Sequence, residues 1–187
     1  DSLKRTLSTI KEDSTKVNTL IELSRNFIDV DNSNAIHYGE EARLLAKKIG
    51  FGKGLGYAYK AIGIGYYTES NYADAYDHFE KSLAIFDSIN YKSGVANMCS
   101  NIGAIMFNTG DSARAIEYHL RSLKVSEEIN DKLRIGTSLN NIGSTYKNNP
   151  ATADKALEYF LKALPIFEGI NHTYGVGAVS GNIGEIY

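Results

Sequence analysis

The sequence predicts an all-α protein built as a solenoid of stacked antiparallel helical hairpins. Three observations support this prediction. Landmark residues recur about every 40 residues, apolar residues within each interval fall at helical spacing, and turn-forming residues separate the helical stretches. No stretch combines period-two alternation of apolar and polar residues with strand-type turns, so a sheet is not expected.

Three series of residues define the repeat. An Ile-Gly pair, an alanine and a second isoleucine each recur at intervals of 40, 40 and 41 residues. The members are Ile62-Gly63, Ile102-Gly103, Ile142-Gly143 and Ile183-Gly184; Ala35, Ala75, Ala115 and Ala156; and Ile49, Ile89, Ile129 and Ile170. Because three independent series share one interval, we interpret the chain as a repeat array, in which Asn148-Asn149-Pro150 forms a longer turn.

The repeat units follow one another in a single array over 1–187. We expect a short helix over 1–12, four units over about 13–51, 52–91, 92–131 and 132–172, and a truncated unit over 173–187. Since the last unit opens like the others and then stops, we expect the native chain to continue beyond Tyr187. The absence of a methionine before Asp1 leads us to expect a native start further upstream.

The second helix of each unit is expected to bury one apolar stripe. The predicted stripes are Ala75, Phe79, Leu83 and Phe86; then Ala115, Tyr118, Leu123 and Val125; then Ala156, Tyr159, Leu164 and Phe167. The glycine of each Ile-Gly pair lies inside the first helix, where it costs about 0.8–1 kcal/mol relative to alanine. We explain these glycines by close approach of the neighbouring helix, for which Ala75, Ala115 and Ala156 supply a small surface.

These landmarks resemble the tetratricopeptide repeat family. The match comprises the Ile-Gly pair, an aromatic residue three positions later (Tyr66, Tyr146 and Tyr187, but Met106 in one unit), and the small alanine of the second helix. The family's usual period is about 34 residues, so this chain resembles the long form found in bacterial sensory and signalling proteins and in Leu-Gly-Asn-repeat scaffolds. The resemblance implies a right-handed superhelix whose concave wall is formed mainly by the first helices.

In the resembled family, the residue two positions before the glycine faces the concave wall. Here these residues are Ala61, Asn101, Asn141 and Asn182. Asparagine is disfavoured inside helices because its amide competes with the backbone for hydrogen bonds. Three asparagines on one line therefore indicate a need for hydrogen bonding, and their amides can bind the backbone of an extended peptide. The alternative is that they bond to the adjacent hairpin and define the stacking.

Other residues extend this candidate surface. Asn97 and Asn140 continue the polar face, and Lys60 offers a positive charge to an acidic ligand. Tyr67 and Phe107 follow their glycines by four positions, either as an apolar strip along the groove or as packing between hairpins. The candidate peptide-binding residues are therefore Asn97, Asn101, Asn140, Asn141, Asn182, Lys60, Tyr67 and Phe107.

Composition and spacing argue against several other functions. With 20 basic and 22 acidic residues and no basic stripe, a nucleic-acid surface is not expected. No apolar run is long enough for a membrane segment, and the single Cys99 excludes an internal disulfide. No His/Cys pair has zinc-ligand spacing, and no signature marks a nucleophile. We therefore expect no catalytic residue, metal or cofactor within these residues.

The sequence-based hypothesis is a protein- or peptide-binding scaffold. We expect it to be the sensory or interaction region of a larger bacterial signalling protein such as a histidine kinase, with any kinase or cyclase domain outside these residues. The alternative is a free-standing adaptor that joins protein partners without an output domain. Self-association is a further alternative, and the sequence leaves both a cytoplasmic and an extracytoplasmic location open.

Overall fold

The computed structural model describes residue 11 and residues 13–187, and the fold of this part is all-α, as the sequence predicts. The described residues form nine α-helices and a short 3-10 helix, without a strand. The α-helices are α2 (Ser14–Phe27), α3 (Asn32–Lys48), α4 (Gly52–Thr68), α5 (Tyr72–Ser88), α6 (Lys92–Asn108), α7 (Ser112–Glu128), α8 (Lys132–Lys147), α9 (Ala153–Gly169) and α10 (Thr173–Gly184), with the 3-10 helix η1 (Pro150–Thr152) before α9. The helix predicted over 1–12 lies outside the described residues.

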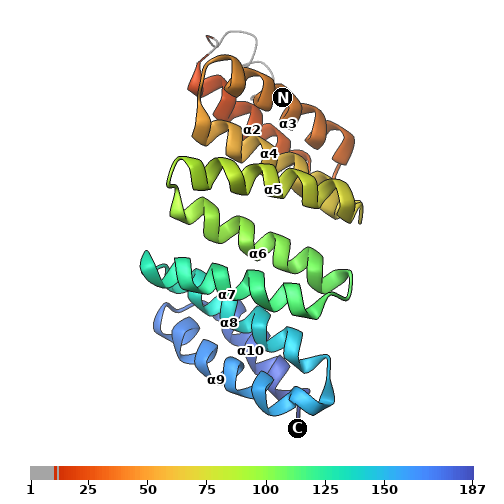
Figure 1. The fold of residues 1–187 in the computed structure, drawn as a ribbon, viewed down its shortest axis with the longest axis vertical. Helices are drawn as coiled ribbons and strands as arrows, with labels where there is room; N and C mark the ends of the chain where they lie inside the picture. Colours follow the sequence, from red (N-terminus) through yellow and green to blue (C-terminus); the bar gives the residue numbers. More distant parts are fainter. Residues whose placement is uncertain (1–10, 12) are drawn as a thin grey trace. The chain divides into compact units, whose positions relative to one another are not determined.

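The chain divides into two compact units, Asp1–Gly94 and Val95–Tyr187. In the first, α2 packs against α3, α3 against α4 and α4 against α5, and α2 also contacts α4 directly (Figure 1). The core between α2, α3 and α4 consists of Val17, Leu20, Ala42, Leu45, Ala46 and Ala58. Alternate helices therefore share one face of this unit, and the grouping of its helices into repeat units stays a prediction.

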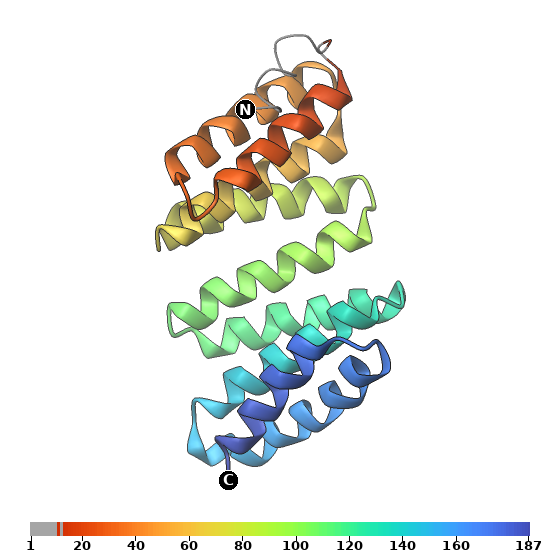
Figure 2. The same ribbon diagram turned by 180° about the vertical axis from the view of Figure 1, so that it is seen from behind.

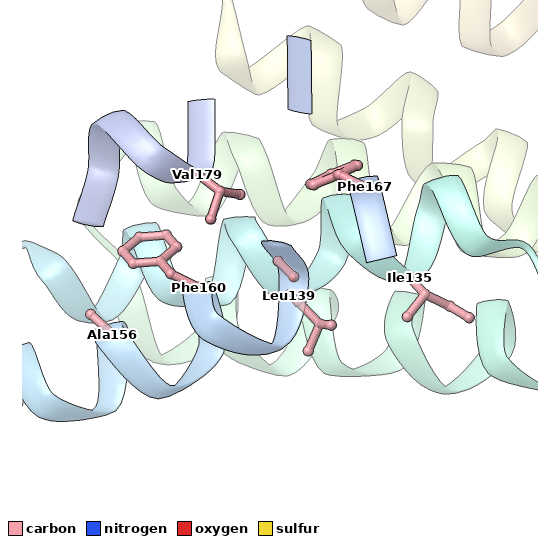
Figure 3. Close-up of a cluster of buried hydrophobic side chains, with 7 residues drawn as sticks. Ile135, Leu139, Ala156, Phe160, Phe167 and Val179 are labelled. Carbon is pink, nitrogen blue, oxygen red and sulfur yellow. The ribbon is translucent and has the colours of Figure 1, made fainter. Parts of the chain in front are cut away.

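The second unit runs from Val95 in α6 to Tyr187. There α8 packs against α7 and α9, and α10 packs against α9 and α8 (Figure 2). Figure 3 shows the core that α8, α9 and α10 share. Its buried residues are Ile135, Leu139, Ala156, Phe160, Ala163, Phe167 and Val179. As in the first unit, alternate helices lie side by side, here α8 and α10.

Three of the four Ile-Gly pairs allow two helices to approach closely, whereas at the fourth pair Ile183 is only partly buried and Gly184 has open space around it, so close approach does not explain that glycine. Ile62, Ile102 and Ile142 are fully buried. A Cβ atom built on Gly63 would lie 2.6 Å from the ring of Phe79 and 3.3 Å from the carbonyl oxygen of Ala75. The glycine therefore lets the second helix lay an aromatic ring on the backbone of the first. The surface opposite the glycine is this ring, and not the predicted alanine alone.

Most of the helices end at residues that adopt left-handed backbone conformations. Positive φ angles occur at Gly50, Ser70, Asn90, Gly110, Asn130 and Asn171, each directly after the last turn of a helix, and at Asp29. The next amide then closes the helix end, as where the Tyr91 N–H donates to the Phe86 carbonyl oxygen at 2.8 Å. Asp111 and Asp131 begin the following helices by accepting backbone N–H groups. The residues between the helices therefore act as helix caps.

The predicted stripes of α7 and α9 are only partly right, since Ala115, Ala156 and Phe167 are buried as predicted but the other predicted members lie one position from the buried residues. In α7 the buried residues are Ala115, His119, Ser122 and Ser126, whereas Tyr118, Leu123 and Val125 are only partly buried. In α9 the buried ring is Phe160 and not Tyr159. The true equivalents of Phe79 at the repeat interval are His119 and Phe160. The prediction chose the nearest apolar residue and therefore missed that the inner face of α7 is polar.

Candidate functional site

The first unit carries a groove between α2 and α4. It consists of two adjoining hollows of about 610 and 300 Å³. The larger is lined by Asn18, Ile21, Glu22, Arg25, Asn26 and Tyr57, and the smaller by Ile21, Arg25, Ile28, Asp29, Tyr57, Lys60, Ala61 and Ile64. Because Ile21, Arg25 and Tyr57 line both hollows, we treat them as one surface, the α2–α4 groove.

Tyr57 is held in place at the wall of the α2–α4 groove. Its hydroxyl lies 2.8 Å from the hydroxyl of Tyr91, and its ring meets the edge of Phe86 at 5.2 Å between centroids. The Lys53 ammonium lies 4.3 Å from the centroid of the Tyr91 ring. The hydrogen bond with Tyr57 and, secondarily, the nearby Lys53 charge lower the pKa of Tyr91. These contacts make Tyr57 a well-anchored side of the groove.

The second unit has a smaller pocket of about 220 Å³ among three helices, which we call the α6–α8 pocket. Ala104 and Phe107 of α6, His119 of α7, and Asn141 and Ser144 of α8 line it. Ala104 and Phe107 are apolar, whereas His119, Asn141 and Ser144 each carry a hydrogen-bonding group. None of these lining residues carries a formal charge at neutral pH when the imidazole is unprotonated.

His119 is the most deeply buried side chain of the α6–α8 pocket. It is 2% exposed, and a Cβ atom built on Gly103 would lie 2.5 Å from its Cε1 atom. Within the described part of the chain, His119 Nδ1 is buried and has no hydrogen-bond partner. Burial lowers the pKa of His119 to about 4. The ring is therefore neutral at physiological pH and has an unused polar atom.

Two of the predicted asparagines bind each other. The Asn182 amide nitrogen donates to Asn140 Oδ1 at 3.1 Å, and the Lys147 ammonium donates to Asn182 Oδ1 at 2.7 Å. Lys147 also forms an ion pair with Glu185. These bonds join α8 to α10, so for Asn182 the contacts support the stacking alternative.

The other predicted residues are distributed over both units. In the first, Lys60 lines the α2–α4 groove, whereas Tyr67 packs against Tyr72, with 5.7 Å between ring centroids. In the second, Asn141 and Phe107 both line the α6–α8 pocket. Two further candidates lie on α6, where Asn101 is partly buried and Asn97 has a buried Oδ1 atom without a partner among the described residues.

Sequence reasoning missed most of the residues that line these hollows, and His119, Tyr57 and Arg25 are three of them. His119 was detectable, because it stands where neighbouring units have Phe79 and Phe160. Tyr57 was also detectable, since it precedes the candidate Asn97 by one 40-residue interval. Arg25 gave no such signal, because an arginine on the polar face of a helix is ordinary in a sequence.

Some kinds of site are absent from the described residues. Residues 11 and 13–187 contain no group of three or more His, Cys, Asp or Glu side chains that could hold a metal ion. No helix in this same part combines the length and apolar character needed to cross a bilayer.

Comparison with known proteins identifies the repeat. Residues 94–169 match the family model described as tetratricopeptide repeat. No curated protein matches the sequence. The fold agrees with solved structures at low sequence identity, which establishes the helical repeat solenoid independently of sequence similarity.

Three of these structures illustrate the likeness. Aspartyl phosphate phosphatase F from Bacillus subtilis has a TM-score of 0.88 and 18% identity over 95% of this chain and 48% of its own. A signal transduction ATPase with numerous domains and a tetratricopeptide repeat sensor, from Pyrococcus horikoshii, has a TM-score of 0.84 and 19% identity over 97% of this chain and 28% of its own. A Rap protein complexed with competence and sporulation factor has a TM-score of 0.68 and 16% identity over 98% of this chain and 56% of its own. This chain thus spans between 28% and 56% of the length of these three proteins.

Proposed function

We propose that this chain, whose residues 94–169 match the tetratricopeptide repeat family, binds a partner protein through an extended peptide segment. The observation that carries the proposal is the α2–α4 groove, which two alternate helices line with charged, aromatic and apolar side chains. A groove with such mixed lining suits a peptide, whose backbone is polar and whose side chains vary.

The charges of the α2–α4 groove favour a peptide over a polyanion. Arg25 and Lys60 supply positive charge, but Glu22 and Asp29 line the same groove. A nucleic acid would be repelled by the two carboxylates, because its binding depends on neutralising successive phosphates. A peptide of mixed charge, with an apolar residue against Ile21, is compatible with both signs.

We further propose that this binding region serves a larger bacterial signalling protein, with a histidine kinase as the expected output. One structural neighbour is described as a signal transduction ATPase with a tetratricopeptide repeat sensor. Another is a Rap protein complexed with competence and sporulation factor. Reading the gene past Tyr187 tests this part, since a stop codon there would contradict an attached output domain.

The proposal gives this chain no catalytic step of its own. One neighbour is an aspartyl phosphate phosphatase, of which this chain spans 48%. Incubation of the chain with acetyl phosphate, and separately with a phosphorylated receiver domain, measures phosphate release directly. We expect release at the rate of the buffer control, and faster turnover would overturn the non-catalytic assignment.

Peptide selection on the 187-residue chain tests the binding proposal. We expect a displayed library of twelve-residue peptides to yield binders. In the double variant Arg25→Ala, Lys60→Ala, the affinity for peptides that carry acidic residues should fall roughly tenfold or more, because charge-assisted hydrogen bonds are lost. Lys124→Ala, at an exposed position of α7, is the matched control and should bind normally. An unenriched library, or equal affinity of the double variant, would contradict the proposal.

A further inference from the structure

The inner face of α7 contains one buried polar side chain whose hydrogen bonding is incomplete. Ser122 Oγ donates to the Ala96 carbonyl oxygen at 2.8 Å, and Ser126 Oγ donates to the Ser122 carbonyl oxygen at 2.7 Å. His119 precedes these serines on the same face of α7. Its Nδ1 atom is buried and has no hydrogen-bond partner in the described part of the chain. A buried polar atom left unpaired costs about 1–3 kcal/mol.

The repeat itself indicates that the fold does not need a histidine there. Phe79 and Phe160 occupy the equivalent positions, and each lays its ring on the glycine of its own hairpin. His119 lies on Gly103 in the same manner. A phenylalanine would therefore fill this position without leaving a polar atom unpaired, and the histidine needs an explanation outside packing.

The α6–α8 pocket, which the His119 side chain lines, gives one such explanation. His119 lines it together with the amide of Asn141 and the hydroxyl of Ser144, while Ala104 and Phe107 provide apolar walls. Its volume of about 220 Å³ corresponds to roughly seven waters at the volume of liquid water. The pocket is thus large enough for one side chain of a bound peptide.

The lining determines the chemistry of that side chain. A neutral imidazole has one donor and one acceptor nitrogen, and the amide and hydroxyl also provide both functions. A carboxylate would find no cation among the lining residues, and an ammonium would find no anion. A primary amide offers both an acceptor and donors without charge, so it matches these groups whichever imidazole nitrogen carries the proton.

We propose that the α6–α8 pocket binds the primary amide of a glutamine side chain, with the His119 imidazole as one hydrogen-bond partner and Asn141 or Ser144 as the other. The methylene groups of the glutamine would lie against Phe107 and Ala104. This inference rests on the proposed function only in that the glutamine belongs to a bound peptide. The chemistry of the pocket is testable without one.

Three blocked amino acids of similar shape serve as probes: the N-acetyl, N-methylamide derivatives of glutamine, glutamate and methionine. NMR of the ¹⁵N-labelled chain follows the imidazole nitrogens of His119, whose signals are assigned by their absence in His119→Phe. We expect the glutamine derivative to shift these signals in a saturable manner, at concentrations roughly tenfold lower than the other two. Equal shifts with all three probes, or none, would overturn the inference.

His119→Phe supplies the second test, since it keeps an aromatic ring and removes both nitrogens. Peptides selected on the unchanged chain should favour glutamine at one position, and the variant should lose that preference while still binding peptides. Asn148→Ala, at an exposed turn, is the control and should keep it. If the library yields no peptide but the glutamine derivative still binds, the proposed function is wrong and the inference that the α6–α8 pocket binds a primary amide is kept. If peptides bind and His119→Phe leaves their preference unchanged, the pocket inference fails.

Discussion

Replacing His119 by phenylalanine should make the protein more stable, and increasingly so as the pH falls. The substitution restores the residue type of Phe79 and Phe160 at the equivalent repeat position and removes a buried nitrogen that has no partner in the described residues. Removing that unpaired atom is worth about 1–3 kcal/mol. We therefore expect the free energy of unfolding at pH 7 to rise within that range.

The pH dependence follows from the lowered pKa of His119. Burial lowers the pKa from 6.5 to about 4 in the folded chain, which corresponds to about 3 kcal/mol in total. Above pH 6.5 the ring is neutral in both states, so the full stability is present. As the pH falls from 6.5 to about 4, the unfolded chain takes up the proton first, and stability is lost by about 1.4 kcal/mol per pH unit. His119→Phe has no such loss.

Urea unfolding followed by far-UV circular dichroism at several pH values between 7 and 4 measures this effect. The difference between variant and unchanged chain isolates position 119, because every other titrating group is present in both. Phe79→His is the reciprocal variant and should introduce a similar loss at low pH. Difference curves that stay flat from pH 7 to pH 4 would refute the reasoning, since they would mean that His119 has an ordinary pKa.

Two further variants test the repeat packing by the same unfolding assay. Ile102→Ala removes a fully buried side chain and should cost about 2–5 kcal/mol; an unchanged free energy of unfolding would mean that the register of α6 is wrong. Gly143→Ala would place a Cβ atom 2.6 Å from the Phe160 ring and should cost about 1–3 kcal/mol. Gly177→Ala, with open space around the glycine, is its matched control and should be neutral or stabilising by about 0.4–1 kcal/mol.

Much of the fold was readable from the sequence because its causes are local. The Ile-Gly pairs mark where one helix lies against another, and Ile62, Ile102 and Ile142 are all fully buried. Asn90 and Asn130 mark helix ends because asparagine tolerates the left-handed conformation that they adopt. Such features depend on residues close together in the sequence, so they can be recognised from the sequence alone.

The candidate site was less readable, because its contacts join residues distant in the sequence. Asn140 and Asn182 are 42 positions apart, and only the packing of α8 beside α10 shows that their amides bond to each other. From the sequence, peptide binding and bonding to the adjacent hairpin both remained open for Asn182. His119 was misjudged for a different reason: the search for an apolar stripe accepted Tyr118 and passed over the buried histidine one position later.

Residues at equivalent positions of different repeat units can be compared with one another. Where packing alone decides the residue, equivalent positions agree, as the four alanines of the second helices do, and Ala35, Ala75, Ala115 and Ala156 are all fully buried. Some departures from this agreement reflect local packing, as where Gly39 stands at the position of Phe79 and lies against Ile62. Tyr57, whose equivalent in the next hairpin is Asn97, lines the α2–α4 groove, and His119, which replaces a phenylalanine, lines the α6–α8 pocket. These two departures line hollows, and the proposed binding of a partner gives a reason for them.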